Sequence, residues 1–269
     1  MLDKTLLRPV SYDQLARIGP PRDGGYVVPV DQLMQCRVLL SLGLNDDWSF
    51  DTACVAKNAN LVVVGVDHTV GRWHFRRKVL RCLWKIGFYA LLLRRKKVRT
   101  YNGYLRNALS YFSFFREPNR HIQKMVAGED GPGKVSVRRL IDDCPAAEQA
   151  DLFLKMDIEG SEYETIADIV SRASRIRCIA AEFHQLDSRT AEFNQAMREL
   201  GREFGLVHIH ANNHSRYDTV NDFPSDVEVS FVNRRFLPAI PTLSPHAYPR
   251  AGLDFPCDIN QPDVRLVFE

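Results

Sequence analysis

The sequence predicts an α/β fold whose mostly parallel sheet is covered by helices on both faces. Apolar, strand-like runs alternate with helical stretches over residues 38–204. Two successive strands that lie parallel in one sheet need such a helix to connect them. The last two apolar runs have no clear helix between them, which predicts one antiparallel strand at the end of the series. The length of 269 residues suits one domain of this class, so we expect residues 1–269 to form a single domain.

Short apolar runs bounded by polar turns identify the expected strands. These runs are Val38–Leu42, Leu61–Asp67, Leu152–Asp157, Cys178–His184, Leu206–Ala211 and Val227–Val232. Helices are expected up to about Asn58, from about Ser161, and across Arg189–Phe204. Residues 237–269 form a proline-rich tail, with six prolines between Leu237 and Pro262, and we expect it to lie extended on the surface.

A strongly basic insertion occupies residues 69–126. It carries 15 Lys and Arg residues against the single acid Glu117, although the net charge of the whole chain is only +3. On a helix, one face would be apolar and the opposite face basic, with Trp73 and Trp84 at the flank. The residues of the apolar face are Phe75, Val79, Cys82, Leu83 and Ile86. This pattern is typical of an interfacial membrane helix, which makes Arg72–Lys97 a candidate for peripheral membrane contact, and equally of a surface helix packed on the sheet.

Composition narrows the class of protein further. With 45% hydrophobic and 26% charged residues, the chain is neither disordered nor fibrous. No apolar run is long enough to span a bilayer, and the N-terminus shows no signal peptide. The six scattered cysteines contain no CxxC pair, which indicates reduced thiols. We therefore expect a cytoplasmic protein, held in part at the inner membrane face, and no nucleic-acid partner, because the leucine-rich face fits burial or membrane better than base stacking.

Polar residues at the strand ends indicate a cofactor pocket, because ligands of open parallel sheets bind beyond the carboxyl ends of the strands. Gly43 follows the first run, and Asp67 ends the second, where a carboxylate commonly accepts hydrogen bonds from ribose hydroxyls. The acids Asp46 and Asp47 in the first turn would repel a pyrophosphate. A positively charged cofactor without phosphate, such as S-adenosylmethionine, fits these acids better.

The segment LKMDIEGSEYE at Leu154–Glu164 resembles the DxEGxE signature of the FkbM-type S-adenosylmethionine-dependent methyltransferases. Supporting segments follow in the order expected for that family: RDGGYVVP (22–29), SLGLNDDWSFD (41–51), VDHTVG (66–71), EFH (182–184), HIHANN (208–213) and EVSFVNRR (228–235). The resemblance implies a Rossmann-like class I methyltransferase fold, with a seven-stranded sheet whose last strand is antiparallel. It also implies O-methylation, here of a hydroxyl on a sugar, glycan or glycolipid. The chain departs from the class pattern in two ways. The glycine-rich first motif of most class I methyltransferases is reduced to one glycine, Gly43, and the basic insertion is long.

On this basis we assign binding roles to strand-end and turn residues. The expected cofactor-binding residues are Asp23, Tyr26, Ser41, Gly43, Asp47, Asp67 and His68. The expected substrate-binding residues are Arg120, His121, Glu159, Asn212 and Asn213.

Methylation of a weakly nucleophilic hydroxyl needs a general base. His184 and Asp157 are the leading candidates, and Glu182, two residues before His184 on the same strand face, would orient the imidazole. His210 is a further catalytic candidate because two asparagines follow it in an expected loop.

Three alternatives remain open at this point. Glu159 and Glu162 would equally serve as acids capping a helix N-terminus. We expect no resident metal, but Asp157, Glu182, His184 and His210 together would suit a divalent ion. A non-catalytic binding module, tethered through the basic helix, is the alternative to an enzyme.

Overall fold

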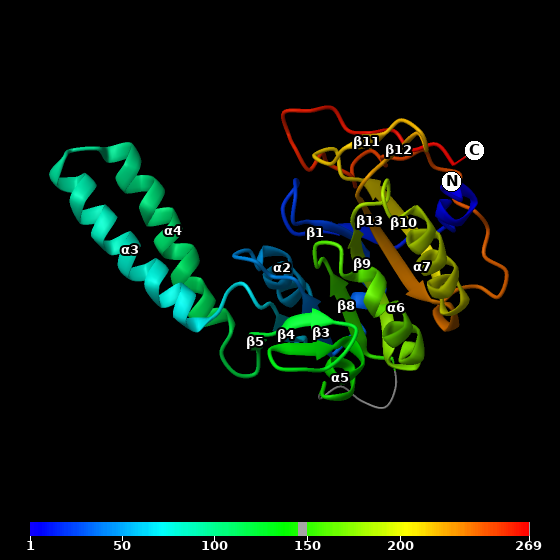
Figure 1. Cartoon of the computed structure of the whole chain (residues 1–269), viewed down its shortest axis with the longest axis horizontal. Coiled ribbons are helices and arrows are strands. Elements are labelled where there is room, and N and C mark those ends of the chain that lie inside the picture. Colours follow the sequence, from blue (N-terminus) through cyan, green and yellow to red (C-terminus); the bar gives the residue numbers. More distant parts are fainter. Residues whose placement is uncertain (145–149, 269) are drawn as a thin grey trace.

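The computed structural model describes residues 1–144 and 150–268 (Figure 1), and within them the main sheet has seven strands in the order β10-β13-β9-β8-β3-β4-β5. The strands are β3 (Val38–Leu42), β4 (Val62–Val66), β5 (Arg120–Ile122), β8 (Leu152–Met156), β9 (Ile176–Phe183), β10 (Phe204–Ala211) and β13 (Val227–Asn233). All neighbours are parallel except β13, which runs antiparallel to both β9 and β10. The predicted fold class is therefore confirmed. Of these seven strands, β5 was not identified from the sequence pattern, because its three residues include a charged arginine and a histidine.

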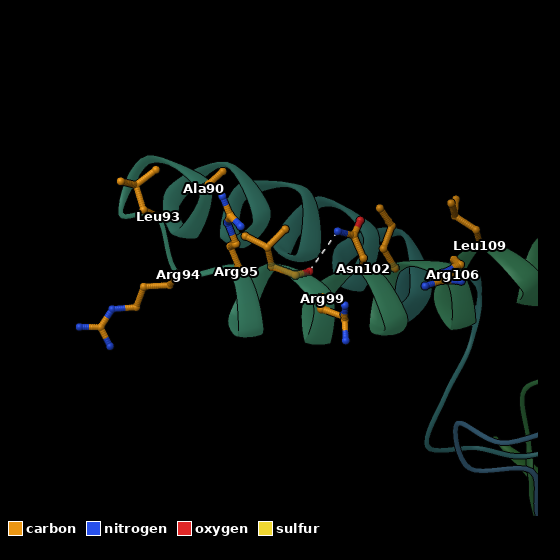
Figure 2. A pocket seen from close by; sticks show the side chains of 10 residues that line it. Ala90, Leu93, Arg94, Arg95, Arg99, Asn102, Arg106 and Leu109 are labelled. Atoms are coloured by element: carbon orange, nitrogen blue, oxygen red, sulfur yellow. Dashed lines mark hydrogen bonds between the residues drawn. The ribbon is translucent and has the colours of Figure 1, made fainter.

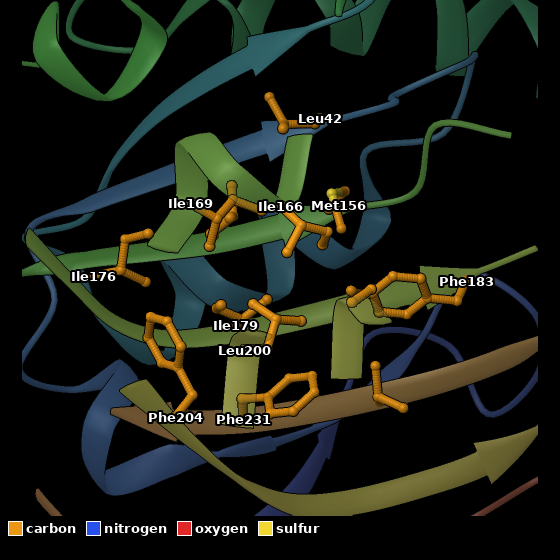
Figure 3. Packing of buried hydrophobic residues seen from close by; sticks show 14 of the residues in the cluster. Leu42, Met156, Ile166, Ile169, Ile176, Ile179, Phe183, Leu200, Phe204 and Phe231 are labelled. Atoms are coloured by element: carbon orange, nitrogen blue, oxygen red, sulfur yellow. The ribbon is translucent and has the colours of Figure 1, made fainter. Parts of the chain in front are cut away.

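Helices cover both faces of this sheet because successive strand residues point to opposite sides. Leu39 packs in the cluster that includes helices α1 (Val30–Leu33) and α2 (Ser49–Lys57). Its neighbour Leu40 packs in the other cluster (Figure 3), which receives residues of α5 (Val137–Asp142), α6 (Glu162–Ser171) and α7 (Thr190–Glu203).

Short elements complete the body. The hairpin of β1 (Leu15–Ile18) and β2 (Tyr26–Pro29) packs on the sheet beside β13. The remaining pairs are β6 (Met125–Ala127) with β7 (Lys134–Ser136) and β11 (Tyr217–Asp218) with β12 (Phe223–Pro224), and the 3₁₀ turns are Lys4–Leu7, Ala173–Arg175 and Arg234–Phe236.

The basic insertion forms a helical hairpin, α3 (Arg72–Leu91) and α4 (Arg95–Phe114), that projects from one end of the body (Figure 1). At its base, Phe75 stacks on Tyr111 with ring centroids 4.1 Å apart, and Trp48 of the body contacts both rings edge-on. The helix α3 packs along α4 and not across the sheet, so the expectation of a helix lying on the sheet is wrong. No helix among the described residues is long and apolar enough to cross a membrane.

The proline-rich tail has no helix or long strand over residues 237–268, but it does not lie wholly on the surface. Tyr248 is 1% exposed, and Asp254 and Asp263 reach two histidines of the edge strand β10. Asp254 Oδ1 lies 3.2 Å from His208 Nε2, and both oxygens of Asp263 lie 3.0 Å from His210 Nε2. The tail therefore covers β10, since an uncovered edge strand would offer unpaired backbone groups to other chains.

We predict that this contact makes stability fall with pH. Burial opposes the charge of His210, but hydrogen bonds to Asp263 and Glu228 raise its pKa to about 10. The stabilisation is complete below the ordinary histidine pKa of 6.5 and is lost as the pH rises towards 10. In urea unfolding, His210→Gln should lower the free energy of unfolding by about 3 kcal/mol at neutral pH and by clearly less at pH 10.

The matched control is His246→Gln, because His246 is exposed on the same tail. An equal cost of His210→Gln at both pH values would contradict the ion-pair explanation.

Candidate active site

The carboxyl ends of β3, β4, β8 and β9 open into a cleft of about 740 Å³. Most residues assigned from sequence line it: Asp23, Tyr26, Gly43, Asp47, Asp67, His68, Asp157, Glu159, Glu182, His184 and Asn212. The cleft brings them together because parallel strands place their carboxyl ends at one edge of the sheet.

The turn after β3 is fixed by two contacts. Gly43 has φ +78°, and a Cβ added there would lie 1.6 Å from the carbonyl oxygen of Asp157, so only glycine fits. Asp67 Oδ2 accepts hydrogen bonds from the backbone N–H groups of Leu44 and Asn45 at 3.0 and 2.8 Å. Gly43 is thus required because the turns after β3 and β8 approach each other closely at this residue, which also lines the cleft.

Asp67 remains ionised at the edge of the cleft. Burial opposes its charge, but hydrogen bonds from Thr69 and from the turn after β3 lower its pKa. The carboxylate therefore carries a full negative charge at neutral pH, where it faces the cleft.

Negative charge dominates the cleft. Among the described residues that line it, eight are acids and two are lysines, Lys124 and Lys155. The acids are Asp23, Asp47, Asp51, Asp67, Asp157, Glu159, Glu182 and Asp226. Such a cleft attracts a sulfonium and an amino group and repels a pyrophosphate.

Asp157, which follows β8, is held as a carboxylate. The Tyr26 hydroxyl donates a hydrogen bond to Asp157 Oδ2 at 3.1 Å, and Lys155 Nζ lies 3.3 Å from the same oxygen. Burial opposes the charge, but Lys155 and His184 lower the pKa of Asp157. Lys155 also donates to the carbonyl of Gly43 at 2.7 Å, which ties the two strand-end turns together.

His184 follows β9, and its ring nitrogens lie within 4.0 Å of four carboxyl groups, those of Asp157, Glu159, Glu162 and Glu182. Its Nδ1 lies 3.0 Å from Glu162 Oε1, and its Nε2 lies 3.9 Å from both Asp157 Oδ1 and Glu182 Oε1. Burial disfavours the imidazolium, but the hydrogen bond to Glu162 and the charge of Glu182 raise the pKa of His184 to about 10. In the free protein, His184 is therefore protonated at neutral pH.

Glu162 and not Glu182 orients the imidazole, so the predicted orienting role of Glu182 is wrong. Glu162 also accepts the backbone N–H groups of Ile158 and Gly160 at 3.1 Å, which fixes the turn before α6. Glu162 thus joins the turn before α6 to the imidazole of His184, and the backbone groups that it holds precede the helix. Burial, together with Asp157 and Glu228, instead raises the pKa of Glu182 to about 8.

Three predicted site residues near the β4 end lie outside the cleft lining. Ser41 is buried within β3. His121 Nδ1 contacts the Tyr111 hydroxyl at 2.7 Å and its Nε2 faces the carbonyl of Asp67 at 3.2 Å, so this ring connects the hairpin to the sheet. Arg120 donates to the carbonyl of Asp143. The polar groups of His121 and Arg120 are used in these internal contacts, and Ser41 is enclosed in the sheet, so the assignments of these three residues to cofactor and substrate are not supported.

Two predicted residues near the end of β10 are likewise used by the tail. His210 is buried between Glu228 and Asp263, and Asn213 donates to the carbonyls of Asp258, Gln261 and Pro262. Of the residues predicted here, Asn212 does line the cleft, where its amide donates to Glu182 Oε1 at 2.7 Å. The predicted catalytic role of His210 is therefore wrong, because the tail occupies its ring nitrogen.

Asp157, Glu182 and His184 also have the geometry to hold a divalent cation, since one ligand atom from each lies within 4.8 Å of the others. His210 belongs to a separate buried group with Glu228 and Cys257. The four-residue metal set considered from sequence is therefore not assembled.

Sequence reasoning also missed several residues of the cleft lining: Asp51, Lys124, Lys155, His214 and Asp226. Asp51 is 2% exposed, and burial raises its pKa. An acid in the first turn of an expected helix is the signal that could have pointed to Asp51, since its position after the first strand places it at the same sheet edge.

Comparison with protein families matches residues 27–205 to the methyltransferase FkbM domain. No curated protein matches the chain. Solved structures with a similar fold include the fibrillarin pre-rRNA processing protein of Methanococcus jannaschii, at 8% identity and TM-score 0.40, covering 75% of this chain and 68% of that one. Another is a putative rRNA-methylase from Clostridium thermocellum, at 9% identity and TM-score 0.40, covering 75% and 90%.

A third is the precorrin-6y C5,15-methyltransferase of Geobacter metallireducens GS-15, at 14% identity and TM-score 0.36, covering 76% and 85%. The family match spans well over half of the chain, including the strand ends that build the cleft. The protein therefore belongs to the FkbM methyltransferase family and is an S-adenosylmethionine-dependent methyltransferase.

Proposed function

We propose that the protein methylates a hydroxyl group of a sugar, glycan or glycolipid. The observation that carries this proposal is His184, placed at the cleft with one ring nitrogen fixed by Glu162 and the other facing Asp157 and Glu182. An oriented imidazole whose free nitrogen faces a cleft is suited to accept a hydroxyl proton. The membership in a methyltransferase family favours this enzyme over the non-catalytic binding module.

Methyl transfer needs alignment and removal of one proton. S-adenosylmethionine supplies the methyl group: the carbon–sulfur bond breaks as the carbon–oxygen bond to the acceptor forms. His184 Nε2 takes the hydroxyl proton, which requires a neutral imidazole. A positive charge bound in the same cleft lowers the pKa of His184, and the ionised Asp157 stabilises the imidazolium that forms.

The acceptor binds beside this pair. Asn212 and the exposed Glu159 offer hydrogen-bonding groups at the rim of the cleft, which suits a polyhydroxylated ligand. Peripheral membrane association through Arg72–Lys97, on the cytoplasmic face, would present a glycolipid acceptor to the cleft. The twelve bases and no acids of residues 72–114 support that association, because anionic lipids attract such a segment.

Cofactor binding tests the role of Asp67. By isothermal titration calorimetry, we expect Asp67→Ala to weaken S-adenosylmethionine about tenfold, because hydrogen bonds to a charged group are worth about 1.5–3 kcal/mol. Asp13→Ala, which removes an exposed acid that is not part of the cleft lining, is the control. Equal affinities of a folded Asp67→Ala variant and the wild type would refute this role.

The second prediction concerns the base and its pH dependence. With a hydroxylated glycan that accepts labelled methyl groups, kcat/KM should rise with pH as His184 loses its proton, with an apparent pKa above 6.5. His184→Gln should remove this rise and lower kcat by about 10²–10⁴-fold. Glu162→Gln should move the rise to lower pH, because the carboxylate that raises the pKa of His184 is gone.

A rise with pH that stays unchanged in His184→Gln would contradict a histidine base, and Asp157 could not replace it as the titrating group, because its pKa is lowered. Titration of the His184 ring by NMR measures the pKa of this residue directly and needs no acceptor. It should be done with and without S-adenosylmethionine.

Chelation distinguishes a histidine base from a metal ion bound by the same three side chains, Asp157, Glu182 and His184. We expect activity to persist after dialysis against EDTA, because His184 acts on the hydroxyl proton directly. Activity lost with EDTA and restored by Mg²⁺ or Mn²⁺ would overturn the base assignment, and would place a divalent ion between Asp157, Glu182 and His184.

A further inference from the structure

The outer face of α3 carries a largely apolar stripe that stays exposed in the described part of the chain. Its residues are Trp73, Leu80, Trp84, Phe88 and Leu91, with exposed fractions of 68%, 67%, 62%, 43% and 83%. At 3.6 residues per turn these positions share an arc of about 80°. The inner face of α3, by contrast, buries Phe75 and Cys82. The helix therefore has one apolar face for folding and a second that folding does not use.

The stripe is ordered by its own contacts. Trp84 and Phe88 stack with ring centroids 5.5 Å apart, and Lys85 Nζ lies 4.9 Å from the centre of the Trp84 ring. Tryptophan beside lysine on an apolar face is the arrangement that favours the boundary between lipid headgroups and acyl chains.

The turn between α3 and α4 extends the apolar surface. Leu91, Leu92 and Leu93 are 83%, 50% and 86% exposed at the end of the hairpin farthest from the body (Figure 1). Leu93 has φ +54°, a left-handed conformation that disfavours a branched side chain. Neither burial nor backbone preference explains a leucine there, which points to a use outside the folded chain.

Beside this turn lies a groove of about 680 Å³ that is lined by both apolar and basic residues (Figure 2). Its apolar lining residues are Ala90, Leu93, Val98, Leu105 and Leu109, and its polar lining residues are Arg94, Arg95, Arg99, Asn102 and Arg106. No ion pair in the described residues joins any of these four arginines to an acid. Guanidinium groups without acid partners are suited to bind phosphate.

We propose that the hairpin docks on a membrane containing anionic phospholipid, with the outer stripe of α3 and the leucines of the turn in the interfacial layer and the groove arginines on lipid phosphates. This membrane contact adds a partner to the proposed function. It rests on that function only for the idea that the acceptor is carried by a lipid. Single-stranded RNA is the other polyanion to consider, but ten of the nineteen large hydrophobic residues exposed in the described chain lie on the hairpin, and RNA would leave its aliphatic surface in water.

Vesicle co-sedimentation tests the proposal with the full chain. The wild type should bind vesicles of phosphatidylcholine mixed with phosphatidylglycerol far more tightly than vesicles of phosphatidylcholine alone. Each of Arg95→Gln, Arg99→Gln and Arg106→Gln should weaken binding to the anionic vesicles about fivefold, since a base near such a surface contributes about 1 kcal/mol. Leu80→Ser with Leu91→Ser should weaken it as well, through loss of apolar contact.

Matched controls remove similar groups elsewhere. Arg8→Gln with Arg202→Gln removes exposed bases of the body, and Val220→Ser with Ile240→Ser removes apolar residues of comparable exposure. Both controls should bind as the wild type does. The fluorescence of Trp73 and Trp84 should shift to the blue on vesicles, whereas Trp48 is already buried.

The proposal would be overturned if the wild type showed no preference for anionic vesicles, or if the hairpin variants bound like the controls. Binding of single-stranded RNA that depends on the arginines but not on Leu80 and Leu91, without vesicle binding, would also overturn it. Calorimetry of S-adenosylmethionine on the same variants keeps the two proposals apart, because cofactor binding should be unchanged when the hairpin surface is altered.

Discussion

The cleft depends on the close packing of two turns, the one after β3 and the one after β8. At Gly43 the first turn approaches the carbonyl of Asp157 so closely that any side chain would collide with it. Asp67 holds the first turn from β4, and Lys155 joins it to Asp157 from β8. Three adjacent parallel strands thus fix the backbone that positions the carboxylates of Asp67 and Asp157.

Electrostatics in the cleft follows from this packing. Acids from several strand ends are brought within reach of one imidazole, so the protein forms a surplus of negative charge before any ligand binds. The surplus keeps His184 protonated in the free protein and raises the pKa of Glu182 to about 8. A cationic methyl donor relieves the same repulsion between the acids, which links cofactor affinity to the protonation state of His184.

The basic hairpin and the proline-rich tail are additions that act at opposite ends of the sheet (Figure 1). The tail is joined to β10 by buried contacts of Asp254 and Asp263 with His208 and His210, and it therefore stabilises the body. The hairpin contacts the body mainly at its base, through Phe75 and Tyr111, and leaves its outer apolar residues uncovered. Two segments of unusual composition thus have different physical roles, which their compositions alone did not separate.

The sequence alone determined the order and type of the main elements, because strand runs such as Val38–Leu42 and Leu152–Met156 are apolar, short and bounded by polar turns. It also located the cleft, since parallel strands bring Gly43, Asp67, Asp157 and His184 to one edge. Only the tertiary structure decided which neighbours each group has. Glu162 reaches His184 from the next helix, and Asp263 reaches His210 from 53 residues away, so each histidine acquires its role from a contact that no local spacing encodes. For α3, periodicity identified the face that packs on α4, but the second apolar face became evident only once the hairpin was seen to project from the body.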